Sequence, residues 1–104
     1  MSAHDRLTFV IAAYEEEKAL PVLHPRIARV MDALAADDIS SRVLYIDDGS
    51  GDATWDVLQG IAAGDARVGL LRLSRNFGKE VALTAGLDLV TEGAAMILDA
   101  DGQD

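Results

Sequence analysis

Cysteine is absent from this 104-residue sequence, which excludes a disulfide framework, a thiolate metal site and a cysteine nucleophile. Basic residues are few: nine Lys and Arg stand against 18 Asp and Glu, giving a formal net charge of −9. A general nucleic-acid-binding protein needs a basic face, so this charge argues against that class. No apolar run approaches the roughly 18 residues of a membrane span, and the first six residues do not resemble a signal peptide. These absences fit a cytoplasmic location.

The composition predicts a single folded domain over residues 1–104. Half of the residues are hydrophobic, and a chain of this size buries roughly two-thirds of its unfolded surface on folding. No internal repeat, low-complexity segment or linker divides the chain.

Four β-rich runs alternate with three segments of helical periodicity. The strands are expected at residues 7–12, 42–46, 68–73 and 94–98. Apolar residues at helical spacing form three stripes, which are Ile27/Val30/Met31/Leu34, Trp55/Leu58/Ile61/Ala62 and Leu83/Gly86/Leu87/Val90. Strands that alternate with helices imply parallel pairing and right-handed crossovers. The predicted fold class is therefore α/β, a Rossmann-like parallel sheet with helices on both faces.

A spatial strand order of 3-2-1-4 is expected, with the first two helices on one face and the third on the other. The first regular helix is expected to begin near Pro25, because proline has no amide hydrogen to donate within a helix. Asp52 is a plausible N-cap of the second helix, and Gly86 permits close packing of the third helix on the sheet. Parallel strands bring all carboxyl ends to one edge, which gathers residues 14–16, 47–50, 74–76 and 99–104 there.

The chain ends in an apolar run followed by alternating carboxylates. Residues 94–98 are expected to form a strand buried on both faces, and Asp99 and Asp101 follow it. Two carboxylates roughly 5 Å apart repel by about 1–3 kcal/mol at effective dielectric constants of about 80 to 20. A divalent cation such as Mg²⁺ or Mn²⁺ turns this repulsion into attraction and binds substrate phosphates. An acidic turn that merely ends a strand is an equally good interpretation of the two carboxylates alone.

Two other polar segments follow predicted strands. In residues 47–52, Asp47 and Asp48 offer acceptors for a nucleobase N–H or a ribose hydroxyl, but a strand-to-helix turn also uses Asp, Gly and Ser. In residues 74–79, Arg75 and Lys79 are placed to meet a phosphate at a helix N-terminus, or Arg75 neutralises the acidic edge.

Tyr14 either stacks on a base or is a half-buried loop residue. His4 and His24 are interpreted as structural or surface residues.

Together these segments resemble the family 2 glycosyltransferases of the GT-A fold, and among them the polyprenyl-phosphate sugar transferases. Four motifs carry the resemblance. They are Val10-Ile11-Ala12-Ala13-Tyr14-Glu15-Glu16, Tyr45-Ile46-Asp47-Asp48-Gly49-Ser50-Gly51-Asp52-Ala53-Thr54, the pair Leu73–Lys79 with Ala82–Asp88, and Leu98-Asp99-Ala100-Asp101-Gly102-Gln103-Asp104. They occur in the family's order and span nearly the whole chain. The resemblance implies the nucleotide-binding half of a GT-A domain.

The resemblance also implies roles for particular residues toward a nucleotide-sugar donor. Tyr14 and Glu16 would contact the base and ribose, Ile46 would line the base pocket and Asp48 would read the base. Residues Asp99, Ala100 and Asp101 would border the ribose and diphosphate. A Mg²⁺ or Mn²⁺ ion would be held by Asp99, Asp101 and Gln103. In this family a lipid phosphate attacks the anomeric carbon with inversion while the nucleoside diphosphate leaves.

The resemblance covers only the donor half of such an enzyme. We therefore expect the acceptor half, which would bind a polyprenyl phosphate, and any catalytic base to lie beyond Asp104. The full-length enzyme is expected at the cytoplasmic face of the membrane, and the 104 residues are expected not to transfer sugar alone. With the strand at 94–98 left at an open edge, self-association or marginal stability is also expected.

Two alternatives come from other classes of protein. The order Asp99-Ala100-Asp101-Gly102 resembles the nucleophile motif of haloacid-dehalogenase-type phosphotransfer enzymes, although those enzymes carry it on their first strand. A receiver-like, non-enzymatic signalling module has a similar length and an acidic edge. It requires acids after strands one and three, whereas here they follow strands two and four.

Overall fold

A computed structural model of the chain describes residues 6–100. It contains four strands and three helices over these residues, in strict alternation. The strands are β1 (Arg6–Ala13), β2 (Ser40–Asp47), β3 (Val68–Arg72) and β4 (Ala94–Asp99). The helices are α1 (Leu20–Ala36), α2 (Thr54–Gly64) and α3 (Lys79–Leu87). The predicted alternation is confirmed.

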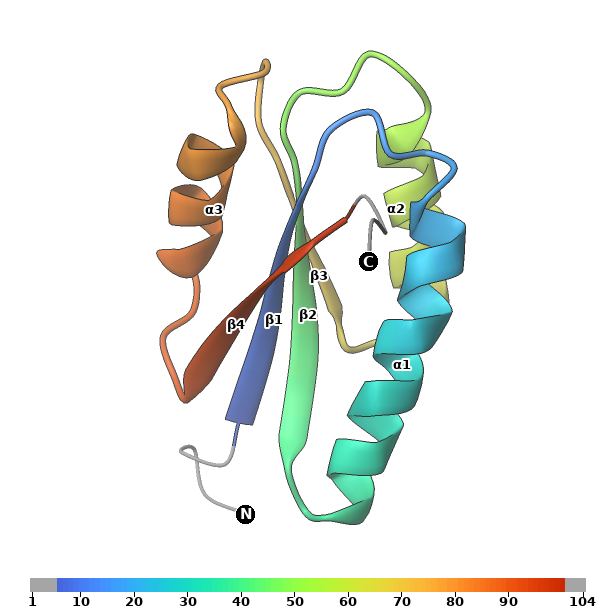
Figure 1. The fold of residues 1–104 in the computed structure, drawn as a ribbon, viewed down its shortest axis with the longest axis vertical. Helices are drawn as coiled ribbons and strands as arrows, with labels where there is room; N and C mark the ends of the chain where they lie inside the picture. The colour runs from blue at the N-terminus through green and yellow to red at the C-terminus, as the bar shows by residue number, and fades with distance from the viewer. Residues whose placement is uncertain (1–5, 101–104) are drawn as a thin grey trace.

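The four strands form one parallel sheet in the order β3-β2-β1-β4. Helices α1 and α2 pack on one face and α3 packs on the other, so the sheet is the middle of three layers (Figure 1). Both the predicted strand order and the distribution of helices are confirmed. The carboxyl ends of β1, β2 and β3 lie at the upper edge in Figure 1.

The core is divided by the sheet, because alternate residues of each strand point to opposite faces. On the α1 and α2 side, Phe9, Ile11 and Tyr45 are buried. On the α3 side, Val10 and Ile46 are buried. The two central strands, β1 and β2, therefore read as nearly continuous hydrophobic runs, as expected of strands covered on both faces.

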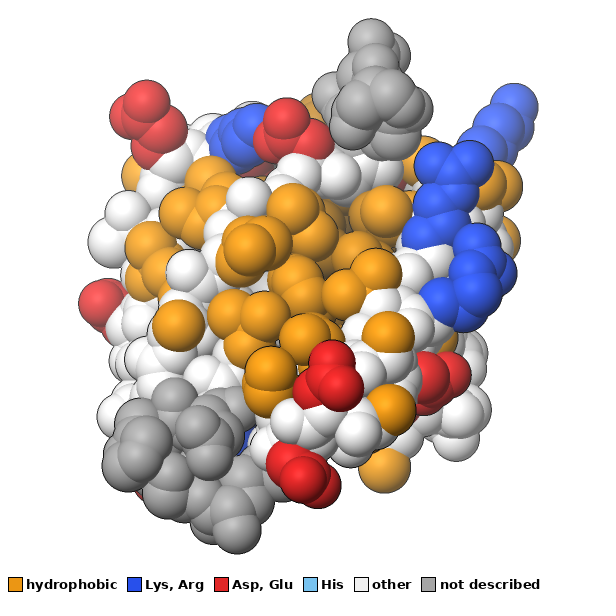
Figure 2. Space-filling model, turned by 60° about the horizontal axis from the view of Figure 1, so that its bottom comes forward, with side chains coloured by type: hydrophobic (Ala, Val, Ile, Leu, Met, Phe, Trp, Pro, Cys, Tyr) orange, Lys and Arg blue, Asp and Glu red, His pale blue; other side chains and the backbone are white. Residues whose placement is uncertain are grey.

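Strand β4 was expected to be buried on both faces, and that prediction is wrong. Five of its six residues are exposed, and the side chains of Met96 and Ile97 are each 47% exposed. The reason is its position at the edge of the sheet, where β1 is its only neighbour among the described strands. Figure 2 shows hydrophobic side chains gathered over one face of the molecule. The expected uncovered apolar surface at an open edge is confirmed.

Helix α1 begins earlier than predicted. It starts at Leu20, so Pro25 lies inside it rather than at its start, and Pro21 lies in the first turn. Pro25 removes one hydrogen bond of the helix. Burial of Leu20, Ile27 and Met31 against the sheet stabilises the 17-residue helix in spite of this loss.

Helix α2 begins one residue later than an Asp52 cap would require. Its N-cap is Ala53, and no side chain caps it there. Asp52 nevertheless has a related role, because its Oδ1 accepts a hydrogen bond from the backbone N–H of Thr54 at 3.0 Å. The prediction identified the correct carboxylate but placed the helix start one residue too early.

Helix α3 packs closely on the sheet at Gly86, as predicted. A Cβ built on Gly86 would lie 2.5 Å from Cδ1 of Ile46, which is closer than two carbon atoms can approach. The glycine therefore allows α3 to rest directly on β2. Among the described residues, no helix is both long enough and apolar enough to cross a membrane.

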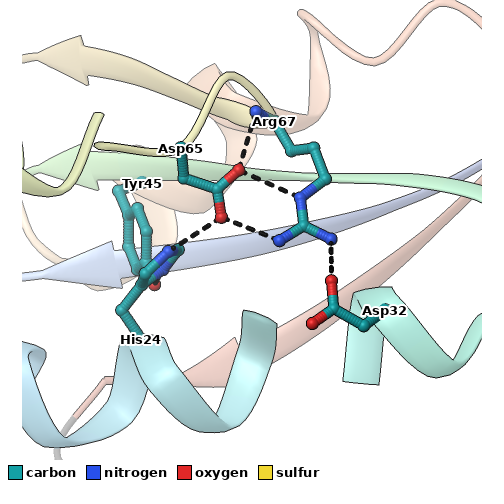
Figure 3. A network of polar contacts seen from close by, with 5 residues as sticks. All are labelled: His24, Asp32, Tyr45, Asp65 and Arg67. Carbon is teal, nitrogen blue, oxygen red and sulfur yellow. Dashed lines mark hydrogen bonds and ion pairs between the residues drawn. The ribbon is translucent and has the colours of Figure 1, made fainter. Parts of the chain in front are cut away.

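A polar network connects α1, β2 and the turn before β3 (Figure 3). His24 Nδ1 lies 2.8 Å from the hydroxyl oxygen of Tyr45, and His24 Nε2 lies 3.3 Å from Oδ2 of Asp65. The Arg67 guanidinium donates to both oxygens of Asp65 and to Oδ1 of Asp32. His24 is thus a structural residue, which agrees with its interpretation from the sequence.

Candidate functional site

A pocket of about 230 Å³ lies at the carboxyl edge of the sheet. It is lined by residues from the end of β1, the β1–α1 loop, the turn after β2, the segment that leads into α3 and the end of β4. These residues are Ala12, Ala13, Tyr14, Glu16, Asp48, Asn76, Gly78, Lys79, Asp99 and Ala100. Segments up to 88 residues apart in the sequence, from Ala12 to Ala100, therefore meet in one cavity, as parallel strands with carboxyl ends at one edge require.

The β1–α1 loop is held in place by the segment that follows β2. The backbone N–H of Glu15 donates to the hydroxyl of Ser50, and the N–H of Glu16 donates to the hydroxyl of Thr54, both at 2.9 Å. Glu15 has a φ of 53°, a left-handed conformation that is rare for a residue with a side chain. These hydrogen bonds fix the loop that presents Tyr14, which is 45% exposed, to the pocket.

Asp48 is the centre of the hydrogen bonds around the pocket. Its carboxylate is nearly fully buried, and Oδ1 accepts from the backbone N–H of Phe77 at 2.9 Å. Oδ2 accepts from the Asn76 side-chain amide at 2.9 Å and from the N–H of Gly78 at 3.1 Å. Several donors therefore satisfy the hydrogen-bonding requirement of this buried carboxylate. Asp48 thereby orders the loop that leads into α3.

Gly49 lets the same loop approach β2. Its φ is +71°, in the region that favours glycine. A Cβ at this position would lie 2.1 Å from the carbonyl carbon of Arg75 and 2.3 Å from the nitrogen of Asn76. The backbone of the loop therefore lies directly against Gly49, and the two motifs form one packed unit.

Asp47 has a structural position next to the pocket. It is fully buried, and its Oδ1 accepts from the N–H of Ser50 at 3.0 Å. Its Oδ2 has no hydrogen-bond partner, although Nε of Arg72 lies 3.9 Å away. Of the two neighbouring acids, Asp48 lines the pocket, whereas Asp47 stabilises the turn that follows β2.

Asp99 and Lys79 form an ion pair in the wall of the pocket. Lys79 is the first residue of α3, and Asp99 is the last residue of β4. Both side chains are more than half exposed, so the pair contributes little to stability. A ligand that competes for either charge can therefore separate the pair at small cost.

The sequence-predicted site residues divide into three groups. Tyr14, Glu16, Asp48, Asp99 and Ala100 all line the pocket. Ile46 does not line it, because its side chain is fully buried against α3.

The third group, Asp101 and Gln103, lies outside the described residues. Among residues 6–100, no group of three or more His, Cys, Asp or Glu side chains is placed to hold a metal ion. Asp99 is thus the described member of the predicted metal-ligand set.

Asn76 and Gly78 also line the pocket, although no role was predicted for them from the sequence. One feature of the sequence could have identified them. Residues 74–79 follow a predicted strand and precede a predicted helix, which places them at the same edge of the sheet as Asp48. Arg75, the residue considered for charge neutralisation, has its guanidinium over the ring of Phe77 at 4.3 Å from the centroid. It is not among the residues that line the pocket.

Residues 8–104 match the family model described as glycosyl transferase family 2. Because this match covers nearly the whole chain, the chain belongs to glycosyltransferase family 2. Membership in this family argues against the two alternatives, a haloacid-dehalogenase-type phosphotransfer enzyme and a receiver-like signalling module.

Two curated relatives are similar over nearly all of the chain. The uncharacterized glycosyltransferase YkcC of Bacillus subtilis (strain 168) is 35% identical over 104 residues, which are 100% of this chain and 31% of the relative. The prophage bactoprenol glucosyl transferase homolog of Escherichia coli (strain K12) is 36% identical over 99 residues, 95% of this chain and 31% of the relative. The chain thus spans about a third of the length of these relatives.

Solved glycosyltransferase structures share the fold. The mannosyltransferase PcManGT of Pyrobaculum calidifontis, in complex with GDP-Man and Mn²⁺, superposes with a TM-score of 0.77 at 23% identity. The match covers 92% of this chain and 27% of that one. Staphylococcus aureus TarS 1–349 in complex with UDP gives a TM-score of 0.73 at 17% identity, with 92% and 27% covered. The predicted fold, the Rossmann-like part of a GT-A domain, is therefore confirmed.

Proposed function

We propose that this chain is the donor-binding part of a divalent-metal-dependent, inverting glycosyltransferase that moves a hexose from a UDP- or GDP-linked donor to a polyprenyl phosphate. The observation that carries the proposal is the convergence of Tyr14, Asp48 and Asp99 on one pocket. The bactoprenol transferase relatives support the lipid phosphate as acceptor. The full-length enzyme would then work at the cytoplasmic face of the membrane.

The pocket offers suitable groups for a nucleoside. Tyr14 provides an exposed ring for stacking on a base, and Glu16 provides a carboxylate for ribose hydroxyls. Asp48 Oδ1 accepts a single described hydrogen bond, so it retains capacity to accept from a nucleobase N–H. The buried position of Asp48 keeps this acceptor fixed before the ligand arrives.

The diphosphate would lie toward Asp99, Ala100 and Lys79 at the other side of the pocket. Asp99 is a hard oxygen ligand in the pocket wall, which fits Mg²⁺ or Mn²⁺; Asp101 and Gln103 are proposed as its fellow ligands. A bound ion supplies positive charge that stabilises the departing diphosphate. The Lys79 ammonium, the first group of α3, adds positive charge on the same side.

In the proposed reaction a phosphate oxygen of the acceptor attacks the anomeric carbon from the face opposite the diphosphate. The bond between that carbon and the diphosphate oxygen breaks, so the configuration inverts. The described residues bind and orient the donor, and the acceptor-binding groups and any catalytic base are proposed to lie beyond Asp104. We accordingly expect no sugar transfer by the 104 residues alone, and product formation from a nucleotide sugar and polyprenyl phosphate would contradict this.

Calorimetric titration of the chain with UDP and with GDP, each with and without Mn²⁺, tests the proposed function. We expect one nucleotide to bind more tightly than the other, and its affinity to rise with Mn²⁺. Asp88→Asn, at an exposed position outside the pocket, serves as a control that should leave binding unchanged. Absence of binding by both nucleotides would contradict the proposal.

A further inference from the structure

Asp47 is a buried acid beside the donor pocket, and one of its two carboxylate oxygens makes no hydrogen bond. Oδ1 accepts from the backbone N–H of Ser50 at 3.0 Å, whereas Oδ2 is buried and has no hydrogen-bond partner. Nearly all buried polar atoms in folded proteins are paired, so an unpaired carboxylate oxygen requires a specific explanation. The surroundings of Oδ2 supply one.

Arg72 places a positive charge next to this oxygen. In the parallel pairing of β2 with β3, Asp47 stands directly opposite Arg72, so both side chains lie on the same face of the sheet. Nε of Arg72 lies 3.9 Å from Oδ2 of Asp47, which is close enough for an ion pair but too long for a hydrogen bond. No other described Lys, Arg or His side chain forms an ion pair with Asp47.

An aromatic ring of α2 holds the Arg72 guanidinium in this position. Cζ of Arg72 lies 5.2 Å from the centroid of the Trp55 ring, and a guanidinium at this distance is attracted to the face of an indole. The Arg72 side chain is 54% exposed, so without the ring it would be free to turn into solvent. Trp55 therefore keeps the guanidinium beside Asp47.

The Asp47 carboxylate is connected to the donor pocket through Ser50. The backbone N–H of Ser50 donates to Asp47, and the Ser50 hydroxyl accepts from the backbone N–H of Glu15 at 2.9 Å. Glu15 has the left-handed φ of 53°, a conformation that persists only where the surroundings hold it. Tyr14, its neighbour in the chain, lines the pocket. Asp47 is thus linked to Tyr14 through Ser50 and Glu15.

The β1–α1 loop also has a separate anchor. The backbone N–H of Glu16 donates to the hydroxyl of Thr54 at 2.9 Å, and this hydroxyl donates to Oδ1 of Asp52. Neither hydrogen bond involves Asp47 or Arg72. A change at Arg72 should therefore reach the backbone N–H of Glu15 and leave that of Glu16 in place.

We propose that Arg72 is a positioning residue for the donor pocket: its charge fixes the Asp47 carboxylate, which fixes Ser50 and thereby the loop that presents Tyr14. Without the guanidinium, the buried carboxylate has no positive neighbour, which favours its turning toward water. That movement would take Oδ1 away from the N–H of Ser50. The consequence for nucleotide binding rests on the proposed function, whereas the positioning of the loop does not.

Amide hydrogen exchange of the ligand-free chain, followed by nuclear magnetic resonance, tests the positioning. Arg72→Gln is expected to raise the exchange rates of the Ser50 and Glu15 amides about tenfold, because their hydrogen bonds open more easily, and to change that of Glu16 by less than about twofold. Arg72→Lys retains the positive charge and should keep most of the protection. An equal rise at all three amides would overturn the proposed route through Asp47.

Arg42→Gln is the matched control. Arg42 is an exposed arginine of the neighbouring strand β2 and forms no ion pair with a described side chain. Its replacement should leave the exchange at Ser50 and Glu15 unchanged. Unchanged exchange in Arg72→Gln, or the same increase in Arg42→Gln, would overturn the proposal.

A double-mutant cycle with Tyr14→Ala tests the consequence for nucleotide binding. In calorimetric titrations with UDP and GDP in the presence of Mn²⁺, Arg72→Gln should weaken binding about fivefold when Tyr14 is present and less than about twofold when it is absent, because residues that act through one another are not additive. Equal losses in both backgrounds would overturn the role of Arg72 in presenting Tyr14. If the unaltered chain binds neither nucleotide, the proposed function fails, and the exchange rates decide whether Arg72 positions the loop.

Discussion

The side-chain amide of Asn76 donates a hydrogen bond of 2.9 Å to the Asp48 carboxylate, which joins the end of β2 to the loop before α3. The two residues are 28 positions apart in the sequence, and both line the candidate pocket. The loop before α3 is therefore positioned by the residue that follows β2.

Replacement of Asp48 by Asn should disorder this loop. One carboxylate oxygen becomes an amide group, which would face the N–H of Phe77 or Gly78 and leave a buried donor unsatisfied, at a cost of about 1–3 kcal/mol. We expect a lower denaturation midpoint and weaker nucleotide binding. Urea unfolding and calorimetry measure the two effects, with Asp88→Asn as the matched control; equal stability of both variants would contradict the role of Asp48.

Gly49→Ala should be much more harmful than alanine at another glycine. The new Cβ would collide with the backbone of Arg75 at a position whose φ is already unfavourable for alanine, so we expect a loss of roughly 1–3 kcal/mol or more. Gly60→Ala is the control, because Gly60 lies inside α2 with open space around it. It should be neutral or stabilising by about 0.5–1 kcal/mol. Thermal unfolding compares the two variants, and similar stabilities would refute the close packing.

Asp65 should make folding stability sensitive to acid. Hydrogen bonds from Arg67 hold the pKa of this carboxyl well below its usual value of 3.8. A folded-state pKa below the unfolded value means that the stabilisation is present above pH 3.8 and is lost as the pH falls further. In the Asp65→Asn variant, the free energy of unfolding should therefore decrease less steeply as the pH falls below 3.8. The difference in slope should be at most about 1.4 kcal/mol per pH unit. Urea unfolding at a series of acidic pH values measures the slope, and Asp88→Asn should not reproduce the change.

Lys79→Met should change two affinities in opposite directions. This variant lacks the ammonium group that would attract the diphosphate. In metal-free buffer, nucleoside diphosphates should therefore bind several-fold more weakly. Mn²⁺ alone should bind more tightly, because Asp99 is no longer paired with Lys79. Lys18→Met removes the same charge outside the pocket and should change neither affinity. Calorimetric titrations that show equal shifts in both variants would contradict the role of Lys79.

The exposed edge strand should make the chain associate. Among the described strands β4 pairs only with β1, and Met96 and Ile97 are half exposed. Ile97→Lys should reduce concentration-dependent association in sedimentation velocity, whereas Val22→Lys, at an exposed position of α1, should not. A chain that remains monomeric at all concentrations would show this prediction to be wrong.

The sequence was sufficient for the architecture because hydrophobic periodicity and parallel pairing follow from local rules. The order of elements, the strand order and the meeting of Tyr14, Asp48 and Asp99 at one edge were all predicted. The start of α1 was not, because burial of Leu20 against the sheet outweighs the bond that Pro25 removes. The apolar composition of β4 wrongly indicated a strand buried on both faces, although the predicted strand order had placed it at the edge, where five of its six residues are exposed.

The hydrogen bonds within the site could not be predicted from the sequence. The spacing of residues 47–50 and 74–79 indicates two loops at one edge, but the donors that surround Asp48 depend on the backbone of the second loop. From the resemblance, Ile46 was predicted to line a base pocket. In the structure its side chain lies in the core instead and packs against Gly86.

We propose that the carboxyl edge of the sheet binds a nucleotide together with a divalent ion. Nuclear magnetic resonance of the chain with UDP or GDP and substoichiometric Mn²⁺ tests it most directly, because the ion broadens signals of nearby residues. We predict selective broadening at Asp48, Asn76 and Asp99, with the signals of Ser41 and Arg42 at the far edge unaffected. Broadening centred on the far edge, or no broadening in the presence of either nucleotide, would contradict this proposal.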